Sequence, residues 1–239
     1  MLFRSQYDKE MPQSLKIKYL EKTVNCDALV VGLAKGPKGL EIVSTLKLDE
    51  KEILQSLNDL GATGKADEVI KLPGTATKVL VFSGLGKASK EYSSETIRRA
   101  LGIAAQNLHG HKSAIFAIDN DARAMAEGAA LGSYSFNDFR GHSKKDQKAP
   151  LSEIYIDADG DNKLLKEVEI VAKWTFFVRD LVNMPPSYLN PKKFAELVSA
   201  KAKKVPGIKV KVWDEKQLDR KSTRLNSSHT DISRMPSSA

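Results

Sequence analysis

The stretch RDLVNMPP, residues 179–186, separates two predicted helices and decides how the chain divides. Upstream of it, apolar residues recur at steps of three and four, which is the spacing of one helix face. The predicted buried face consists of Leu164, Val168, Val171, Thr175, Val178 and Val182. Pro185 and Pro186 end this helix, because proline donates no helix hydrogen bond and pushes the preceding residue toward extended geometry.

Downstream of the proline pair, the sequence predicts a second helix and then a strand. Asn190 is a typical helix cap, and Pro191 suits the first helical position. The predicted inward face consists of Phe194, Leu197, Val198, Ala202 and Val205. Pro206-Gly207 ends the helix, and residues 208–213 then alternate apolar side chains with lysine, as in a strand with one covered face. Residues 164–213 therefore have the pattern of a junction between two domains.

Residues 27–156 alternate strand-like and helix-like segments. Buried-strand runs occur at 27–34, 78–82, 113–118 and 154–156, and amphipathic or small-residue helical patterns occur at 48–60, 93–108 and from 119 onward. A weaker pattern predicts an edge strand at 15–19 and a short returning strand at 40–44. Strands that alternate with helices indicate an α/β domain with a largely parallel sheet.

Three segments of this sequence resemble one known family in the right order. Residues 179–218, which begin RDLVNMPPSYLNPKKFAELVSAKAKK, resemble the opening of the catalytic domain of leucyl aminopeptidases, the cytosol aminopeptidase family. The runs KVLVFSGLGK (78–87) and AEGAALGSYSFNDFRG (126–141) resemble the N-terminal domain of that family.

The resemblance implies a domain organisation and a fold. Residues 1–163 would form a macro-domain-like N-terminal domain with a mostly parallel sheet. Residues 164–218 would form a long linker helix and the truncated start of a doubly wound α/β catalytic domain. Residues 219–239 are rich in serine and have no apolar periodicity, and we interpret them as a translated adapter sequence, the alternative being a disordered tail.

Composition sets broad limits on function. Hydrophobic residues make up 41% of the 239 and charged residues 28%, as in ordinary globular proteins. Cys26 is the single cysteine, which fits a reducing compartment, and neither a signal peptide nor a run of about 20 apolar residues is present. We therefore predict a cytoplasmic protein without membrane contact. Residues 219–239 carry +2 of the net charge of +8, and the remaining +6 is spread over helix surfaces, so a solvated lysine surface is favoured over nucleic-acid binding.

A glycine-rich segment, Ser83-Gly84-Leu85-Gly86-Lys87, follows a predicted strand. Glycines at such a turn can let backbone amides approach a phosphate, so a nucleotide-binding hypothesis arises. The segment lacks the third glycine of the dinucleotide fingerprint and the four-residue insert of a P-loop. The sequence therefore favours a simple turn between a strand and a helix.

The sequence contains no strong catalytic or metal motif. His109-Gly110-His111 is predicted to lie at a helix end on the surface, and Asp157, Asp159 and Asp161 are predicted to form a turn, since residue 168 is valine where a calcium loop needs glutamate. Arg179 and Asp180 are predicted to orient the end of their helix. We assign no catalytic, metal-binding or cofactor-binding residue in this chain.

The resemblance implies a parent enzyme that releases N-terminal amino acids from peptides as a homohexamer with two zinc or manganese ions. The metal-binding motifs of that family come from later segments, which these 239 residues do not contain, so this chain is predicted to be inactive. Two other hypotheses remain: a module that binds a nucleotide or ADP-ribose at Gly84-Leu85-Gly86, and an inactive subunit that assembles with full-length hexamers.

Overall fold

The computed structural model describes residues 15–21, 24–119, 121–214 and 216–217. The chain divides into two compact units, one ending at Asn183 and the other beginning at Met184. We describe each unit by itself. The linker helix belongs to the first unit, so the observed division lies twenty residues after the predicted domain boundary at 163/164.

The first unit is built on one mixed sheet, and in the described residues this sheet has seven strands. Its order is β1-β7-β6-β2-β5-β4, with β3 paired to β2 beside β6. The pairs β1/β7, β7/β6, β6/β2 and β2/β5 are parallel, whereas β2/β3 and β4/β5 are antiparallel. The strands are β1 (Lys16–Tyr19), β2 (Ala28–Gly36), β3 (Gly39–Val43), β4 (Val69–Pro73), β5 (Val79–Lys87), β6 (Ser113–Phe116) and β7 (Glu153–Ile156). The prediction of an α/β unit with a mostly parallel sheet is confirmed.

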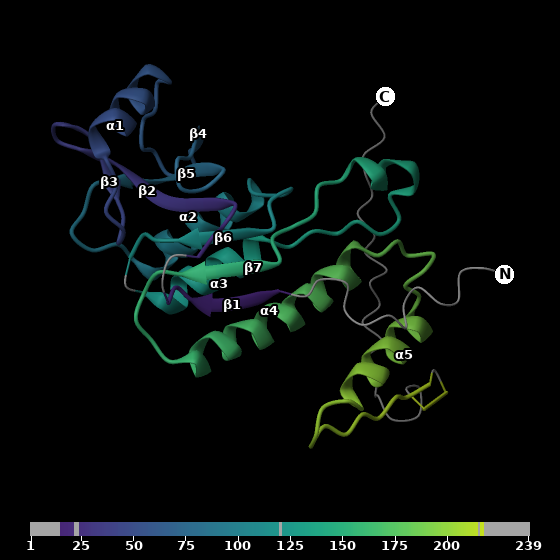
Figure 1. The fold of residues 1–239 in the computed structure, drawn as a ribbon. Coiled ribbons are helices and arrows are strands. Elements are labelled where there is room, and N and C mark those ends of the chain that lie inside the picture. Colours follow the sequence, from purple (N-terminus) through teal and green to yellow (C-terminus); the bar gives the residue numbers. More distant parts are fainter. Residues whose placement is uncertain (1–14, 22–23, 120, 215, 218–239) are drawn as a thin grey trace, which may run out of the picture. The chain divides into compact units, whose positions relative to one another are not determined.

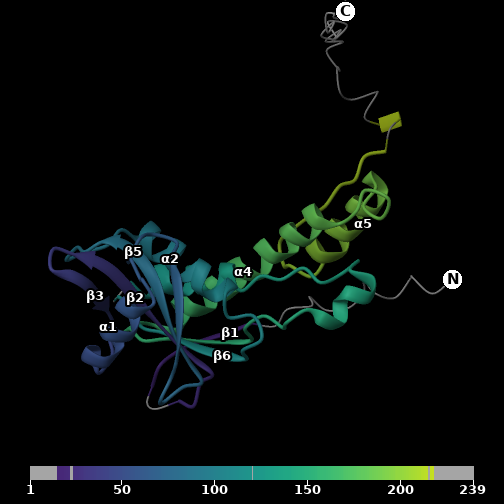
Figure 2. The same ribbon diagram turned by 90° about the horizontal axis from the view of Figure 1, so that it is seen from above.

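Helices cover both faces of this sheet (Figures 1 and 2). One face carries α1 (Glu50–Asp59), whose Leu57 packs with Val31, Leu33 and Phe82. The other face carries α2 (Ser94–Gln106), α3 (Ala122–Gly132) and α4 (Asn162–Asn183), which share a larger core with Val30, Val81 and Phe116. Neighbouring residues such as Val30 and Val31 point to opposite faces because side chains alternate along a strand, so a strand buried on both faces is apolar throughout.

Three helices, α2, α3 and α5 (Pro191–Ala202), start at a side chain that caps the first turn. The side chain of Ser93 accepts a hydrogen bond from the Thr96 amide at the start of α2. Asp121 caps α3 through the Ala124 amide, one or two residues later than predicted. In the second unit, Asn190 accepts from the Lys193 amide and Pro191 is the first residue of α5. Each cap satisfies an amide that has no partner inside its helix.

The helix α4 exists as predicted, but the predicted buried face is correct only in its first part, where Val168 is buried and Leu164 packs against the core. The residues of α4 that pack into the core of this unit are Leu165, Val168, Ala172 and Phe176. Val171, Val178 and Val182, which were expected to be buried, are 56%, 56% and 78% exposed. The helix carries apolar residues on two faces, so their spacing alone does not identify the face that meets the core.

The inner side of α4 also completes the edge of the sheet. A carboxylate oxygen of Glu169 accepts a hydrogen bond, 2.7 Å long, from the backbone amide of Ile17 in β1. On the same helix, Glu167 pairs with Arg123 of α3. Because β1 is the outermost strand on this side of the sheet, the Glu169 contact satisfies an edge amide that has no strand partner there.

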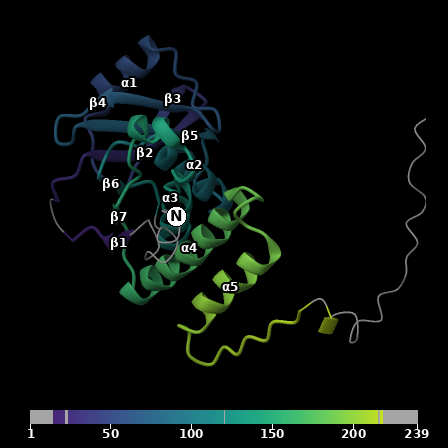
Figure 3. The same cartoon turned by 90° about the vertical axis from the view of Figure 1, so that its right-hand side faces the viewer.

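The second unit contains α5 and an irregular segment that follows it (Figure 3). The predicted strand at 208–213 is wrong, because residues 207–214 form no regular element. Ile208, Val210, Val212 and Trp213 are all more than 40% exposed. An isolated extended segment is unstable without a neighbouring strand to satisfy its backbone groups, and the described residues provide none. The interpretation of residues 219–239 as a non-native tail lies outside the described residues.

The structure also contains two elements that the sequence patterns did not predict. The strand β4 pairs antiparallel with β5 and lies at the sheet edge opposite β1. A short 3-10 helix, η1 (Gly141–Asp146), lies between α3 and β7. Residues 69–73 read VIKLP, and a strand of five residues that ends in proline is a weak sequence signal.

Candidate functional site

The glycine-rich segment that suggested a phosphate-binding turn is the end of a strand. The strand β5 continues to Lys87, with a register shift against β2 between Leu33 and Ala34. The amide of Gly84 donates to the carbonyl of Glu68 at 2.8 Å, and the amide of Gly86 donates to the carbonyl of Gly64 at 2.9 Å. Both amides are therefore already paired within the protein, and the geometry does not support a phosphate cradle here.

Close approach of a neighbouring loop explains the glycine at position 84. A Cβ atom at Gly84 would lie 1.8 Å from the carbonyl oxygen of Lys65. The Glu68 carboxylate holds this loop by accepting from the amides of Thr63 and Gly64, and Arg99 pairs with Asp67. The glycine therefore serves close packing between the loop and the strand.

A basic hollow lies at the carboxyl ends of β2 and β5. Its volume is about 700 Å³, and its lining consists of Lys35, Gly36, Pro37, Lys65, Ala66, Gly86, Lys87 and Ala88. Three lysines and no carboxylate line it, so its charge favours an anion over a cation. The three lysine side chains are exposed, however, and nothing in their surroundings selects one anionic group over another.

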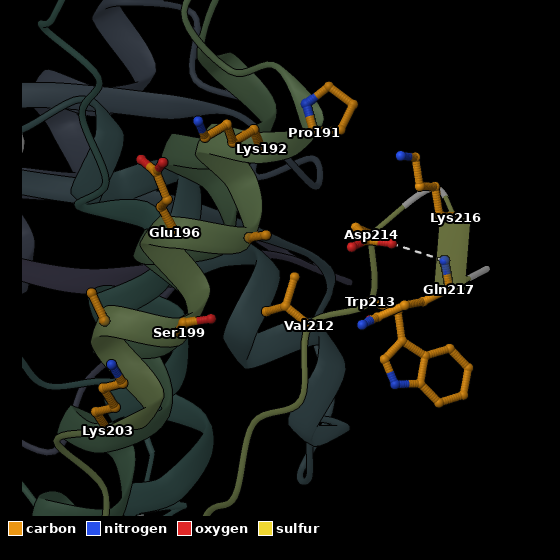
Figure 4. A pocket seen from close by; sticks show the side chains of 12 residues that line it. Pro191, Lys192, Glu196, Ser199, Lys203, Val212, Trp213, Asp214, Lys216 and Gln217 are labelled. Carbon is orange, nitrogen blue, oxygen red and sulfur yellow. Dashed lines mark hydrogen bonds between the residues drawn. The ribbon is translucent and has the colours of Figure 1, made fainter.

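A second hollow lies within the second unit, between α5 and the segment that follows it (Figure 4). It measures about 1040 Å³ and is lined by side chains that include Lys192, Glu196, Lys203, Val212 and Trp213. Asp214 is engaged with the amide of Gln217 at 2.8 Å. The hollow is a gap beside one helix rather than an enclosed site with converging polar groups, so it carries no chemistry.

The histidine pair at the end of α2 forms no metal site. His109 and His111 are half-buried rather than on the surface as predicted, and burial lowers the pKa of each below its ordinary value. Within the described part of the chain, no group of three or more His, Cys, Asp or Glu side chains is arranged to hold a metal ion. His142 is exposed in η1, and His229 lies outside the described residues.

The aspartates after β7 act in the turn between this strand and α4. Thr45 donates a hydrogen bond to the carboxylate of Asp157, and the Asp161 carboxylate accepts from the Lys163 amide at 2.9 Å. Asp159 is exposed in the same turn. These contacts agree with the turn that was predicted in preference to a calcium loop.

Arg179 and Asp180 lie in a polar network at the end of α4. The Tyr134 hydroxyl donates to Asp180 at 2.8 Å, and the Asn183 side-chain amide donates to the same hydroxyl at 3.1 Å. The Arg179 guanidinium donates to the Leu131 carbonyl at 2.7 Å and lies 5.3 Å from the centroid of the Tyr134 ring. These contacts attach the end of α4 to the last turn of α3 and to Tyr134 just after it, which agrees with the orienting role predicted for Arg179 and Asp180.

Burial shifts the acid–base properties of this network. Burial is the largest cause that raises the pKa of Asp180, and the nearby negative charge of Asp138 raises it further, against the opposing hydrogen bond from Tyr134. Burial likewise raises the pKa of Tyr134 above its ordinary value. Asp180 therefore binds a proton more readily in the folded chain than in the unfolded chain.

We expect the Asp180 carboxyl to make stability fall as pH rises. Between the ordinary aspartate pKa and the raised pKa in the fold, the folded chain binds more protons, so the free energy of unfolding decreases with increasing pH. Groups such as Asp27 and Asp121, whose pKa is lowered in the fold, act in the opposite direction in both proteins, so the Asp180 effect appears in the difference between them. Urea unfolding between about pH 4 and pH 7 should show the free energy of unfolding of the wild type falling, relative to that of Asp180→Asn, as pH rises. Asp180→Ala should cost a further ~1 kcal/mol relative to Asp180→Asn, because alanine leaves the Tyr134 hydroxyl without its acceptor. Equal slopes for the wild type and Asp180→Asn would contradict the assignment.

The fold and these sites define a class of protein: an α/β domain, in whose described residues no metal-binding group is assembled, followed by a second unit. Residues 30–143 match the family described as "Cytosol aminopeptidase family, N-terminal domain". A relative from Streptomyces avermitilis, named "Probable cytosol aminopeptidase", is 39% identical over 82% of this chain and 43% of its own length. This chain therefore belongs to the cytosol aminopeptidase family and corresponds to its N-terminal part.

Solved structures agree with this assignment at the level of the fold. A mutant of tomato leucine aminopeptidase matches 89% of this chain and 47% of its own, with a TM-score of 0.62 and 19% identity. The "Bottromycin maturation enzyme BotP in complex with Mn" matches 74% of this chain and 36% of its own, with a TM-score of 0.55 and 23% identity. The chain thus spans less than half the length of each of these proteins.

The described residues do not fit the two divalent metal ions that the family resemblance implies. Such a site needs several carboxylate or imidazole ligands around each ion, and no such group is assembled in the part of the chain that the structure describes.

Sequence reasoning identified Arg179 and Asp180 but missed their partner Tyr134, whose distance of 46 residues from Asp180 leaves no signal in the sequence. No helix among the described residues is long and apolar enough to cross a membrane.

Proposed function

We propose that this chain supplies the N-terminal, non-catalytic part of a metal-dependent aminopeptidase that releases N-terminal amino acids from peptides. The observation that supports this most strongly is the match of residues 30–143 to the N-terminal domain of the family. The similarity to the Streptomyces avermitilis relative extends over 82% of the chain, well beyond that domain. The proposed role of this chain is structural: it forms an α/β domain and the linker helix that leads toward the catalytic part.

The catalytic chemistry belongs, in this proposal, to the part of the relatives that has no counterpart here. Two divalent ions, zinc or manganese, would polarise the peptide carbonyl and lower the pKa of the attacking water. Manganese is the metal named with BotP. No residue of this chain is proposed as a ligand, and the assembled enzyme is proposed to be a cytoplasmic homohexamer.

A chimera tests this proposal. Residues 1–183 are joined to the part of the Streptomyces avermitilis relative that follows the position aligned with Asn183. We expect this chimera to hydrolyse leucine p-nitroanilide in the presence of Mn²⁺ or Zn²⁺, at a rate within about tenfold of the intact relative, because the metal ligands all come from the relative's segment. The 239-residue chain assayed with the same metals should show no hydrolysis above the blank. A folded chimera without activity, or an active 239-residue chain, would contradict the proposal.

The structure weakens one of the two other hypotheses, nucleotide binding, and leaves the other, assembly with full-length subunits, open. Binding of a nucleotide or ADP-ribose at Gly84-Leu85-Gly86 loses its physical basis, because the Gly84 and Gly86 amides donate to protein carbonyls. The basic hollow nearby could attract an anion only through exposed lysines. Assembly with full-length subunits remains the alternative proposal, and failure of the chain to co-purify with an intact hexameric relative would remove it.

A further inference from the structure

The helix α4 has a second apolar face that the first unit leaves uncovered. Its inner face packs into the core through residues such as Leu165, Val168 and Phe176. On the outside, Ile170 is 57% exposed, Val171 and Val178 are each 56% exposed, and Val182 is 78% exposed. We call these four residues, together with the half-buried Trp174, the outer stripe.

The outer stripe has the spacing of a helix–helix or helix–sheet contact. Val171, Trp174, Val178 and Val182 follow one another at steps of three and four, so they lie on one side of the helix. From Ile170 to Val182 the stripe extends over about 18 Å at 1.5 Å per residue. Trp174 is held edge-on against Phe177, with ring centroids 6.0 Å apart. Single exposed apolar residues are ordinary, but a continuous row of them marks an interaction surface.

We propose that the outer stripe is the docking surface for the catalytic part of an aminopeptidase chain. This inference rests on the proposed function. More than half the length of the Streptomyces avermitilis relative has no counterpart in this chain. That remaining part of the relative is the occupant that we propose for the outer stripe. The stripe reaches Val182, next to Asn183, where the first unit ends and the chain passes into the second. An apolar surface at that end of the helix is suitably placed for a part that follows in sequence.

The size of the outer stripe argues for a covalently attached occupant over a second copy of this chain. A stable interface between separate proteins needs about 20–30 residues on each side, whereas the stripe offers five. A tethered partner has a high effective concentration, so a small apolar contact suffices to hold it. The stripe then forms one section of an interdomain interface, which is commonly smaller than an obligate one.

Thiol labelling measures whether the stripe is covered. The single native thiol, Cys26, is 2% exposed and burial raises its pKa, so it reacts slowly with maleimide. Val178→Cys and Val182→Cys, placed separately in the 239-residue chain, should therefore label quickly. The same substitutions in the chimera with the Streptomyces avermitilis relative should label at least tenfold more slowly. Leu60→Cys is the matched control, since Leu60 is 61% exposed in the same unit, and its rate should be equal in both proteins.

The outcomes separate the docking surface from the proposed function. Equal labelling of Val178→Cys in chain and chimera overturns the docking surface, whatever the activity. If the 239-residue chain by itself labels slowly, and labels faster when it is diluted, a second copy of the chain covers the outer stripe. That result also overturns the docking surface for the catalytic part. Slow labelling in a chimera that folds but lacks aminopeptidase activity supports the docking surface and contradicts the function. If the chimera does not fold, cysteine at the aligned position of the intact relative is labelled instead, and fast labelling there overturns the docking surface.

Discussion

Replacing Gly132 with alanine is expected to lower the free energy of unfolding of the first unit by about 3 kcal/mol, the upper end of overpacking costs. A Cβ atom at this position would lie 2.1 Å from the carbonyl oxygen of Gly102 and 2.6 Å from its Cα. Both atoms belong to the backbone of α2, so relief requires the two helices to move apart. That movement would disturb the α2–α3 contact that forms much of the larger core.

Gly102→Ala is the matched control for this prediction. Gly102 lies at the same contact, but its added Cβ would meet only the Gly128 carbonyl oxygen, at an ordinary 3.5 Å. Alanine is the better helix former by about 1 kcal/mol, so Gly102→Ala should be neutral or slightly stabilising. Urea unfolding followed by far-ultraviolet circular dichroism measures both variants. If Gly132→Ala unfolds at the same urea concentration as the wild type, helices α2 and α3 are not packed as closely as the structure shows.

Replacing Phe116 with alanine is expected to cost about 3–5 kcal/mol, the usual range for removing a buried phenylalanine. Phe116 is fully buried in β6 at the centre of the sheet and packs in the larger core of the first unit. The substitution removes the ring from neighbours on both the sheet and the helices, and a rigid core closes only part of the resulting cavity. Thermal unfolding should show a clearly lower midpoint.

Phe139→Ala is the control for the loss of a phenyl ring without a cavity. Phe139 is 41% exposed, and its ring stacks on Phe136 with centroids 6.2 Å apart. Because solvent already reaches this ring, its removal should cost less than about 1 kcal/mol. Similar losses for the two variants would mean that Phe116 does not sit in a close-packed interior.

The local signals in the sequence predicted most elements of the first unit correctly. Continuous apolar runs located β2, β5 and β6, because strands buried on both faces have no polar side. Ser93 and Asn190 located the starts of α2 and α5, since capping depends on a side chain only three residues from the amide that it satisfies. Signals of this kind act over a few residues and therefore survive in the sequence.

The errors arose where a distant partner decides the outcome. The glycines at 84 and 86 favour a turn by composition, yet pairing with β2 and the loop at 61–68 keeps this segment in a strand. Residues 208–213 alternate like a strand, yet the described residues offer them no neighbour. The half-buried environment of His109 likewise depends on packing around the end of α2 that its sequence neighbours do not reveal.

The candidate sites show the same division between local and distant signals. The sequence predicted that Arg179 and Asp180 orient the end of their helix, and it predicted a turn at Asp157 and Asp161. It could not supply Tyr134 as the hydrogen-bond partner of Asp180, or Thr45 as the partner of Asp157, because these pairs are 46 and 112 residues apart.

By itself, the sequence determined the class of the fold, the starts of α2 and α5, and the family, because these depend on short-range periodicity, capping and motif order. Only the tertiary structure decided which face of α4 is buried. Leu165, Ala172 and Phe176 on one side and Val171, Val178 and Val182 on the other are both apolar enough to enter a core. The inner face enters it because the network at Tyr134 and the contact between Glu169 and Ile17 hold the helix in that orientation. Such contacts join residues far apart in the chain, and a periodic pattern contains no information about them.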